Sequence, residues 1–153
     1  MTNDHTFLSV AMEQARIGFS EGGIPIGAAL VVEGQVLATG RNRRVQMGSA
    51  IRHGETDCLE NAGRLPASVY ARATIYTTLS PCDMCTGAIL LYGIKRVVVG
   101  ENRTFMGAEE LLRSRGVEVV VLDDPECVAL MERFIAERPS LWNEDIGVVD
   151  EAI

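Results

Sequence analysis

The sequence predicts an α/β fold in which a central mixed five-stranded sheet forms the middle layer of a three-layer α/β/α sandwich. Two observations lead to this prediction. Segments with helical periodicity alternate with short apolar strands, and the first two strands are joined by a turn too short for a helix. A hairpin requires antiparallel pairing, whereas the later strand–helix–strand connections favour parallel neighbours. The sheet is therefore expected to contain both kinds of pairing.

The expected helices follow from apolar spacing and from the residues that start and stop helices. In the first, Phe7, Ala11 and Ala15 recur at helical spacing, and Gly22-Gly23 ends the segment. In the third, Pro81 is suited to a first helical turn because it has no N–H to lose. The expected helices span residues 5–20, 53–62, 80–93, 108–115 and 125–137.

The expected strands are rich in β-branched or small apolar residues. Glu33-Gly34 is the turn of the first hairpin. Residues 40–52 form a polar loop, and the tail, residues 138–153, has no clear periodicity although it contains the single tryptophan, Trp142. The expected strands span residues 28–32, 36–39, 73–79, 97–99 and 118–122.

Length and charge limit the classes of function. The 153 residues fit one domain, residues 1–153, and the formal net charge is −7. A protein that grips a phosphate backbone usually carries a basic surface, so this charge favours a small neutral substrate over nucleic acid. No apolar run is long enough to span a bilayer, and the polar start Met1–Asp4 is not typical of a signal peptide. We therefore expect a cytoplasmic protein.

Two short motifs carry the chemistry. His53-Gly54-Glu55 and Pro81-Cys82-Asp83-Met84-Cys85 together read H-x-E…P-C-x-x-C, which is the signature of zinc-dependent deaminases. On the first turn of a helix, Cys82 and Cys85 have their sulfurs on one side and can hold one ion. His53 supplies a third ligand from the start of another helix, which leaves the fourth position of a catalytic zinc site for water.

Glu55 is the candidate proton carrier. It lies two residues from His53, close enough to reach a zinc-activated water without displacing it. A carboxylate in that place can take up and return protons, so we expect Glu55 to act in general acid–base catalysis. Cys58 and Cys127 stand alone in the sequence and are expected to be small buried apolar residues.

Three other interpretations account for these motifs less completely. A redox pair would use Cys82 and Cys85 but leave His53 and Glu55 without a role. A structural zinc site would need a second C-x-x-C or a histidine pair, and the sequence has neither. A non-enzymatic zinc module would fill all four ligand positions with protein atoms. The joint pattern favours a catalytic zinc site.

From these motifs outward, nearly the whole chain resembles the fungal-type cytosine deaminases of the cytidine deaminase superfamily. The zinc motif is shared by the whole superfamily, whereas Trp142 and Asp145 in the tail are far more specific to the cytosine deaminase branch. The matching stretches are residues 21–27, 48–50, 53–55, 59–61, 76–89, 98–102 and 137–139, with Trp142 and residues 144–147.

The resemblance implies one zinc ion per chain on His53, Cys82 and Cys85, with Glu55 as the proton shuttle. It also implies a set of substrate contacts. Those that involve polar groups would come from Asn42, Asp145 and the backbone N–H of Gly54, which would hold the polar edge of the ring, and from the backbone carbonyl of Ser80, which would accept a hydrogen bond from the leaving amino group.

The remaining implied contacts are apolar. Phe105 and Trp142 would cover the ring, and Ile26 would form part of the pocket wall. The resemblance further implies a helix–sheet–helix sandwich and a homodimer.

The expected activity is the hydrolytic deamination of free cytosine to uracil and ammonia. Alternatives within the same chemistry are isocytosine, an amino-triazine or a purine base as substrate. A tRNA adenosine deaminase that flips its target base is a further alternative. The acidic net charge and the tail with Trp142 and Asp145 argue against it.

Overall fold

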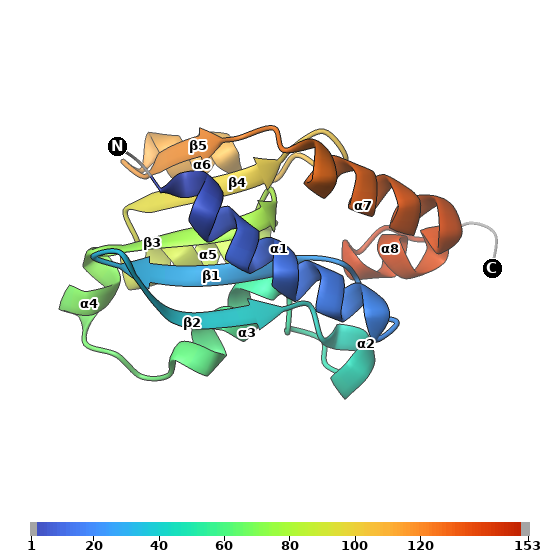
Figure 1. Cartoon of the computed structure of the whole chain (residues 1–153), viewed down its shortest axis with the longest axis horizontal. Helices are drawn as coiled ribbons and strands as arrows, with labels where there is room; N and C mark the ends of the chain where they lie inside the picture. The colour runs from blue at the N-terminus through green and yellow to red at the C-terminus, as the bar shows by residue number, and fades with distance from the viewer. Residues whose placement is uncertain (1–2, 151–153) are drawn as a thin grey trace.

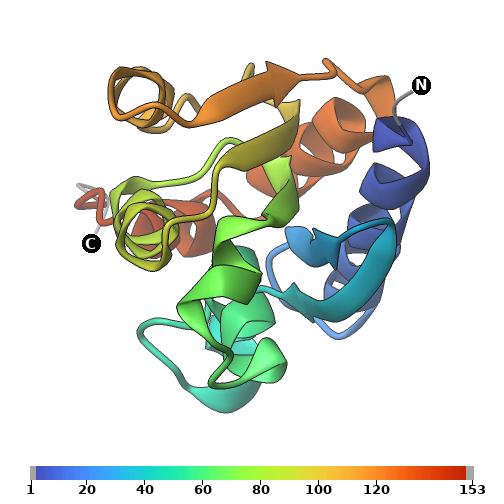
Figure 2. The same cartoon turned by 90° about the vertical axis from the view of Figure 1, so that its left-hand side faces the viewer.

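The computed structural model describes residues 3–150, which form a central sheet with helices on both faces (Figure 1, Figure 2). Residues 1, 2 and 151–153 of the expected domain lie outside this range. The sheet has five strands in the order β2-β1-β3-β4-β5, so the predicted mixed five-stranded sheet is confirmed. The strands are β1 (Gly27–Val32), β2 (Gln35–Arg41), β3 (Ala73–Leu79), β4 (Arg96–Glu101) and β5 (Glu118–Val121).

Strand direction places the ends of four strands at one edge of the sheet. β1 pairs antiparallel with both β2 and β3, whereas β3, β4 and β5 pair in parallel. β2, β3, β4 and β5 therefore run the same way and end at the edge from which β1 starts. β2 is three residues longer than expected, because it begins at Gln35 and because Gly40 and Arg41 continue the ladder opposite Ala28 and Gly27.

Three helices were missed by the sequence prediction: α2, α4 and α8. Each has seven residues or fewer, which is too short to show helical periodicity. α5 begins three residues later than expected, because Cys82 is its N-cap. The helices are α1 (Asp4–Ser20), α2 (Arg44–Met47), α3 (Gly54–Ala62), α4 (Ala67–Ala71), α5 (Asp83–Tyr92), α6 (Glu109–Ser114), α7 (Pro125–Glu137) and α8 (Pro139–Asp145).

The sheet is buried on both faces. Along β1, Ala28, Leu30 and Val32 belong to the apolar cluster that includes buried residues of α3, α5 and α6. Ala29 and Val31 point the other way and belong to the cluster with α1 and α7. This alternation is the period-2 geometry of a strand, and it accounts for an uninterrupted apolar sequence in a strand covered on both sides.

A third apolar cluster lies at the edge where β2, β3 and β4 end. Figure 1 shows α7 and α8 beyond these strand ends. Trp142 on α8 is buried against this cluster, so the tail of the chain covers the edge of the sheet. The buried members are Ile24, Ile26, Leu79, Met131, Phe134 and Trp142.

Among residues 3–150, no helix is both long and apolar enough to cross a membrane.

A substitution at Gly40 tests the close packing of α3 on β2. A Cβ at this position would lie 2.2 Å from the Cys58 backbone nitrogen and 2.6 Å from its Cα. We expect Gly40→Ala to lower the free energy of unfolding by about 1–3 kcal/mol, because one backbone must move. Gly18→Ala is the control: its new methyl would lie no closer than 3.5 Å to any neighbour, and alanine favours a helix by about 0.5–1 kcal/mol. Urea denaturation measures both, and equal stability of the two variants would contradict the packing argument.

Candidate active site

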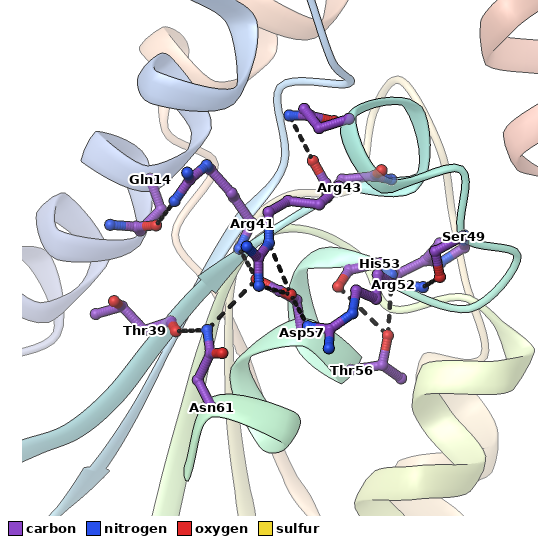
Figure 3. Close-up of polar contacts among 12 residues, drawn as sticks. Gln14, Thr39, Arg41, Arg43, Ser49, Arg52, His53, Thr56, Asp57 and Asn61 are labelled. Carbon is purple, nitrogen blue, oxygen red and sulfur yellow. Dashed lines mark hydrogen bonds and ion pairs between the residues drawn. The ribbon is translucent and has the colours of Figure 1, made fainter. Parts of the chain in front are cut away.

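The predicted metal ligands stand at the N-terminal ends of two helices. His53 is the N-cap of α3 and Cys82 the N-cap of α5, and both have extended backbone angles. The His53 N–H donates to Thr56 Oγ1 over 2.9 Å, which satisfies a donor at the helix start and fixes the local backbone (Figure 3). The positive ends of both helix dipoles therefore face one point, where they favour thiolate sulfur.

The side chains at this point match the geometry of a zinc site. Cys82 Sγ lies 3.4 Å and Cys85 Sγ 3.8 Å from His53 Nδ1, and the three ligand atoms lie within 4.8 Å of one another. A tetrahedral zinc ion with ordinary Zn–S and Zn–N bonds holds sulfur and nitrogen about 3.6 Å apart. The residues present therefore fit zinc without rearrangement.

The charges of the triad depend on one another. Hydrogen bonds from Cys85 and His53 lower the pKa of Cys82 to about 4, despite its burial. Burial acts to lower the pKa of His53, but the bond to Cys82 and the nearby Asp145 and Glu55 raise it to about 9. Zinc would take the place of the protons that now bind these ligand atoms.

Glu55 is buried in the second position of α3, with 4% of its surface exposed. Burial, together with the nearby Cys82 sulfur, raises the pKa of the Glu55 carboxyl to about 7. A group whose pKa lies near the working pH can both accept and donate a proton, so Glu55 suits proton transfer.

Opposite the cysteines, a buried carboxylate and amide form a polar wall. Asp145 Oδ1 accepts a hydrogen bond from Asn42 Nδ2 over 3.1 Å and lies 3.5 Å from His53 Nε2. Arg44 joins the pair: its guanidinium lies 3.3 Å from Asp145 Oδ1, and its backbone N–H donates to Asn42 Oδ1 over 3.1 Å. Burial raises the pKa of Asp145 although these partners oppose the shift.

The wall and the metal ligands enclose a small cavity. Phe105 and Trp142 meet edge to face over it, with ring centroids 5.9 Å apart and planes at 87°. This contact places two aromatic rings against the space beside Glu55, which suits a flat heterocycle. The cavity is lined by Ile26, His53, Glu55, Leu79, Ser80, Cys82, Phe105, Trp142, Asp145 and Ile146.

A buried ion-pair cluster holds α3 to the loop that carries Asn42. The Asp57 carboxylate accepts hydrogen bonds from the side chains of Arg43 and Arg52 over 2.6–3.0 Å and from the Arg41 N–H over 3.0 Å (Figure 3). These partners lower the pKa of Asp57 despite its burial. The cluster thus fixes the start of α3 relative to the end of β2. The distance between Glu55, at the start of α3, and Asn42, just after β2, depends on this arrangement.

Eight of the eleven predicted site residues line one cavity, and three lie behind its wall: Asn42, Gly54 and the fully buried Cys85. Asn42 is fully buried and holds Asp145, while Gly54 packs against Ile26, which a Cβ would meet at 3.2 Å. Three contributors were missed: Leu79 and Ile146 in the lining, and Arg44 behind it. Their neighbours Ser80 and Asp145 were candidates, but no motif distinguishes these three from ordinary apolar or surface residues.

Residues 1–101 match the family described as the cytidine and deoxycytidylate deaminase zinc-binding region. The cytosine deaminase of Candida albicans is 60% identical over 146 residues, which is 95% of this chain and 97% of that protein. The chain belongs to the cytidine and deoxycytidylate deaminase family. Membership of this zinc-binding deaminase family agrees with the His53, Cys82 and Cys85 geometry.

Proteins named for a different kind of substrate are also similar to this chain. The tRNA-specific adenosine deaminase of Bacillus subtilis is 31% identical over 147 residues, 90% of this chain and 91% of that protein. A solved structure from work on A-to-I editing by tRNA:A34 deaminases superimposes with a TM-score of 0.70 at 28% identity, and covers 82% of this chain and 99% of its own. The deaminase fold is therefore common to members with large and small substrates.

The four cysteines provide a matched test of the metal site. We expect Cys82→Ala and Cys85→Ala to lose the zinc, because each removes one of the three ligands. Cys58→Ala and Cys127→Ala should keep about one zinc per chain, since both thiols are buried elsewhere and burial raises the pKa of each to about 12. Metal analysis of the four purified variants measures this directly. Zinc retained at wild-type level after loss of Cys82 or Cys85 would contradict the assignment.

Proposed function

We propose that the protein is a zinc-dependent hydrolase that converts free cytosine to uracil and ammonia. The observation that carries the proposal is the buried Asp145, which Asn42 holds in place and which faces the zinc ligands across a cavity covered by Phe105 and Trp142. A closed cavity with one polar wall suits a free pyrimidine base, whose ring carries hydrogen-bonding groups along one edge. The identity of 60% to a cytosine deaminase supports the same substrate.

The proposed roles combine the positions of the side chains with the roles that the resemblance implies for Asn42 and the Gly54 N–H, which lie behind the cavity wall. Asn42, Asp145 and the Gly54 N–H hold the ring edge away from the amine, while Phe105, Trp142 and Ile26 enclose its faces. Bound zinc supplies an activated water as the nucleophile for ring carbon C4. Glu55 would accept one proton from that water and give it to ring N3. It would then carry the proton of the hydroxyl added at C4 to the amino group, so that the C4–N bond breaks, ammonia leaves and the C4 carbonyl of uracil forms. The Ser80 carbonyl accepts a hydrogen bond from the departing amine.

The excess of acidic groups in the chain and beside the cavity favours an uncharged base over a nucleotide as the substrate. The pocket beside the cavity is lined by Asp83, Glu144 and Asp145 as well as by Arg44, which is ion-paired with the last two, and the net charge of the chain is −7. Phosphate groups would be repelled by such a surface. We therefore propose a free nucleobase as the substrate, no nucleic-acid partner and a cytoplasmic location.

Incubating the zinc-loaded protein with cytosine and measuring ammonia tests the function directly. A panel of isocytosine, an amino-triazine, adenine and guanine under the same conditions tests the alternatives. Higher kcat/KM on any of these than on cytosine would replace cytosine as the proposed substrate. A mobility shift with tRNA at moderate salt tests the tRNA adenosine deaminase alternative, which the lower identity of 31% makes weaker.

Glu55→Gln should lower kcat by about 10²–10⁴-fold, because the amide cannot carry the proton. Zinc content should stay at the wild-type level, since Glu55 is not one of the ligands. Glu60→Gln, an exposed glutamate on the same helix, makes the same charge change and should keep full activity. Substantial turnover by Glu55→Gln would remove Glu55 from its role.

We also propose that the protein is a homodimer. A surface formed by α3, α4, α5 and the adjoining loops is lined mostly by apolar residues, with Glu60 and Arg64 among them. It also exposes 75% of Leu91, 62% of Ile51 and 46% of Tyr92. Contiguous apolar surface of this kind is typical of a subunit interface, and a second copy of the chain is its proposed occupant.

Leu91→Glu should shift the protein toward monomer in sedimentation velocity, because the interface would then bury an unpaired charge. Val149→Glu, which changes an apolar residue that is 84% exposed beyond α8, should leave the association state unchanged. A wild-type protein that sediments as a monomer at micromolar concentration would contradict the dimer.

A further inference from the structure

Glu109 is a buried carboxylate that the proposed mechanism does not use. We infer that Glu109 is a positioning residue for release of the amine. It acts through Ser80, whose backbone carbonyl accepts a hydrogen bond from the departing amine in the proposed mechanism. The inference rests on the proposed function, because it concerns the leaving amine of cytosine. It depends on three sets of contacts among described residues.

The first set joins Glu109 to Ser80. Glu109 is the first residue of α6 and has 2% of its surface exposed. The Ser80 hydroxyl donates to Glu109 Oε2 over 2.6 Å and accepts from the Gly107 N–H over 2.9 Å. A side chain with one donor and one acceptor both engaged has a fixed rotamer, so Glu109 determines the orientation of Ser80.

The second set fixes the peptide unit that carries the Ser80 carbonyl. The Ser80 N–H donates to the Glu101 carbonyl over 3.0 Å, and the Ala108 N–H donates to the Pro81 carbonyl over 3.2 Å. Gly107 packs so closely here that a Cβ would lie 1.8 Å from the Pro81 oxygen. Both peptide units that flank the carbonyl are thereby held to residues 101–109.

The third set explains why Glu109 is the centre of this arrangement. Glu109 Oε1 accepts from Asn102 Nδ2 over 3.3 Å and lies 3.6 Å from the Arg113 guanidinium. One carboxylate thus connects the end of β3, the end of β4 and the start of α6. The segment between β4 and α6 includes Phe105, and Glu101 holds its first residues by accepting from the N–H groups of Arg103 and Thr104.

Burying a carboxylate costs free energy unless its partners compensate. Arg113, the cationic partner, is half exposed and not at hydrogen-bond distance from Glu109, whereas the Ser80 hydroxyl forms the shortest contact. The strongest interaction of Glu109 is therefore made with a residue that lines the cavity. A small rotation of the Ser80 peptide would move its carbonyl away from the amine without changing the metal ligands or the Asn42–Asp145 wall.

The test compares reactions that do and do not involve the amine. Glu109→Gln keeps the shape of the side chain but replaces one acceptor oxygen with a donor nitrogen, which cannot satisfy all three donors. Glu110→Gln is the matched control, since Glu110 is the next residue of α6 and is exposed. The measurements are kcat and KM for cytosine, single-turnover rates, zinc content and the inhibition constant of pyrimidin-2-one, which has no amino group.

We expect Glu109→Gln to lower kcat and the single-turnover rate about tenfold, the loss that follows when a reacting group is slightly misplaced. KM, zinc content and the inhibition constant of pyrimidin-2-one should stay within about twofold of wild type, because no contact to the rest of the ring has changed. Glu110→Gln should match wild type throughout. An unchanged kcat, or a parallel rise in the inhibition constant that shows a distorted cavity, would overturn the inference.

Ser80→Ala removes the same hydrogen bond from its other end, and it carries the test if Glu109→Gln does not fold. It should lower kcat about as much as Glu109→Gln, and the double variant should be no worse than about twofold below either single one. If the kcat losses of the two single variants multiply in the double variant, Glu109 acts independently of Ser80, and this result would overturn the inference. A wild-type protein that releases no ammonia from cytosine would overturn the proposed function itself, which is a separate outcome.

Discussion

The structure depends on the convergence of three strand ends and two helix N-termini at one edge of the sheet. Because β2, β3 and β4 run the same way, the chain leaves each of them at that edge. α3 and α5 begin there, so His53 meets Cys82 and Cys85 within 4.8 Å, although 29 residues separate His53 from Cys82. The close contact between Gly40 on β2 and the backbone of Cys58 allows α3 to pack directly against the sheet. The closeness of the three metal ligands therefore depends on the direction of the strands as much as on the sequence motif.

The far side of the cavity is built by the last helix. α8 packs on α7 and places Trp142 and Asp145 over the strand ends. Asp145 is then tied back to Asn42 and Arg44, both from the segment after β2. Residues more than 100 positions apart thus share one hydrogen-bonded group, and the helix that closes the cavity also supplies its polar wall. The ion pair between Arg44 and Glu144, with a 2.8 Å contact, adds a second tie outside the cavity.

The metal ligands and Glu55 could be predicted because their spacing and the adjacent helix starts are local features of the sequence. The alternation of buried strands and helices likewise predicted the mixed sheet. α8 could not be predicted, since seven residues show no period and the helix is stabilised by the burial of Trp142. Arg44 and Glu109 could not be found either, because the sequence shows a charge but not its burial or its partners. The proposed substrate contact of Asn42 follows only from the resemblance, because a lone asparagine between arginines is usually a turn residue.

A crystal structure of the zinc-loaded protein with pyrimidin-2-one bound tests the central claim most directly. The claim is that the ring lies between Phe105 and Trp142, with its polar edge on the Asn42–Asp145 wall. We expect Asn42 and Asp145 to make hydrogen bonds to the ring and the Ser80 carbonyl to face the C4 position. A ring bound elsewhere, with Asn42 and Asp145 contacting only each other and Arg44, would contradict the account.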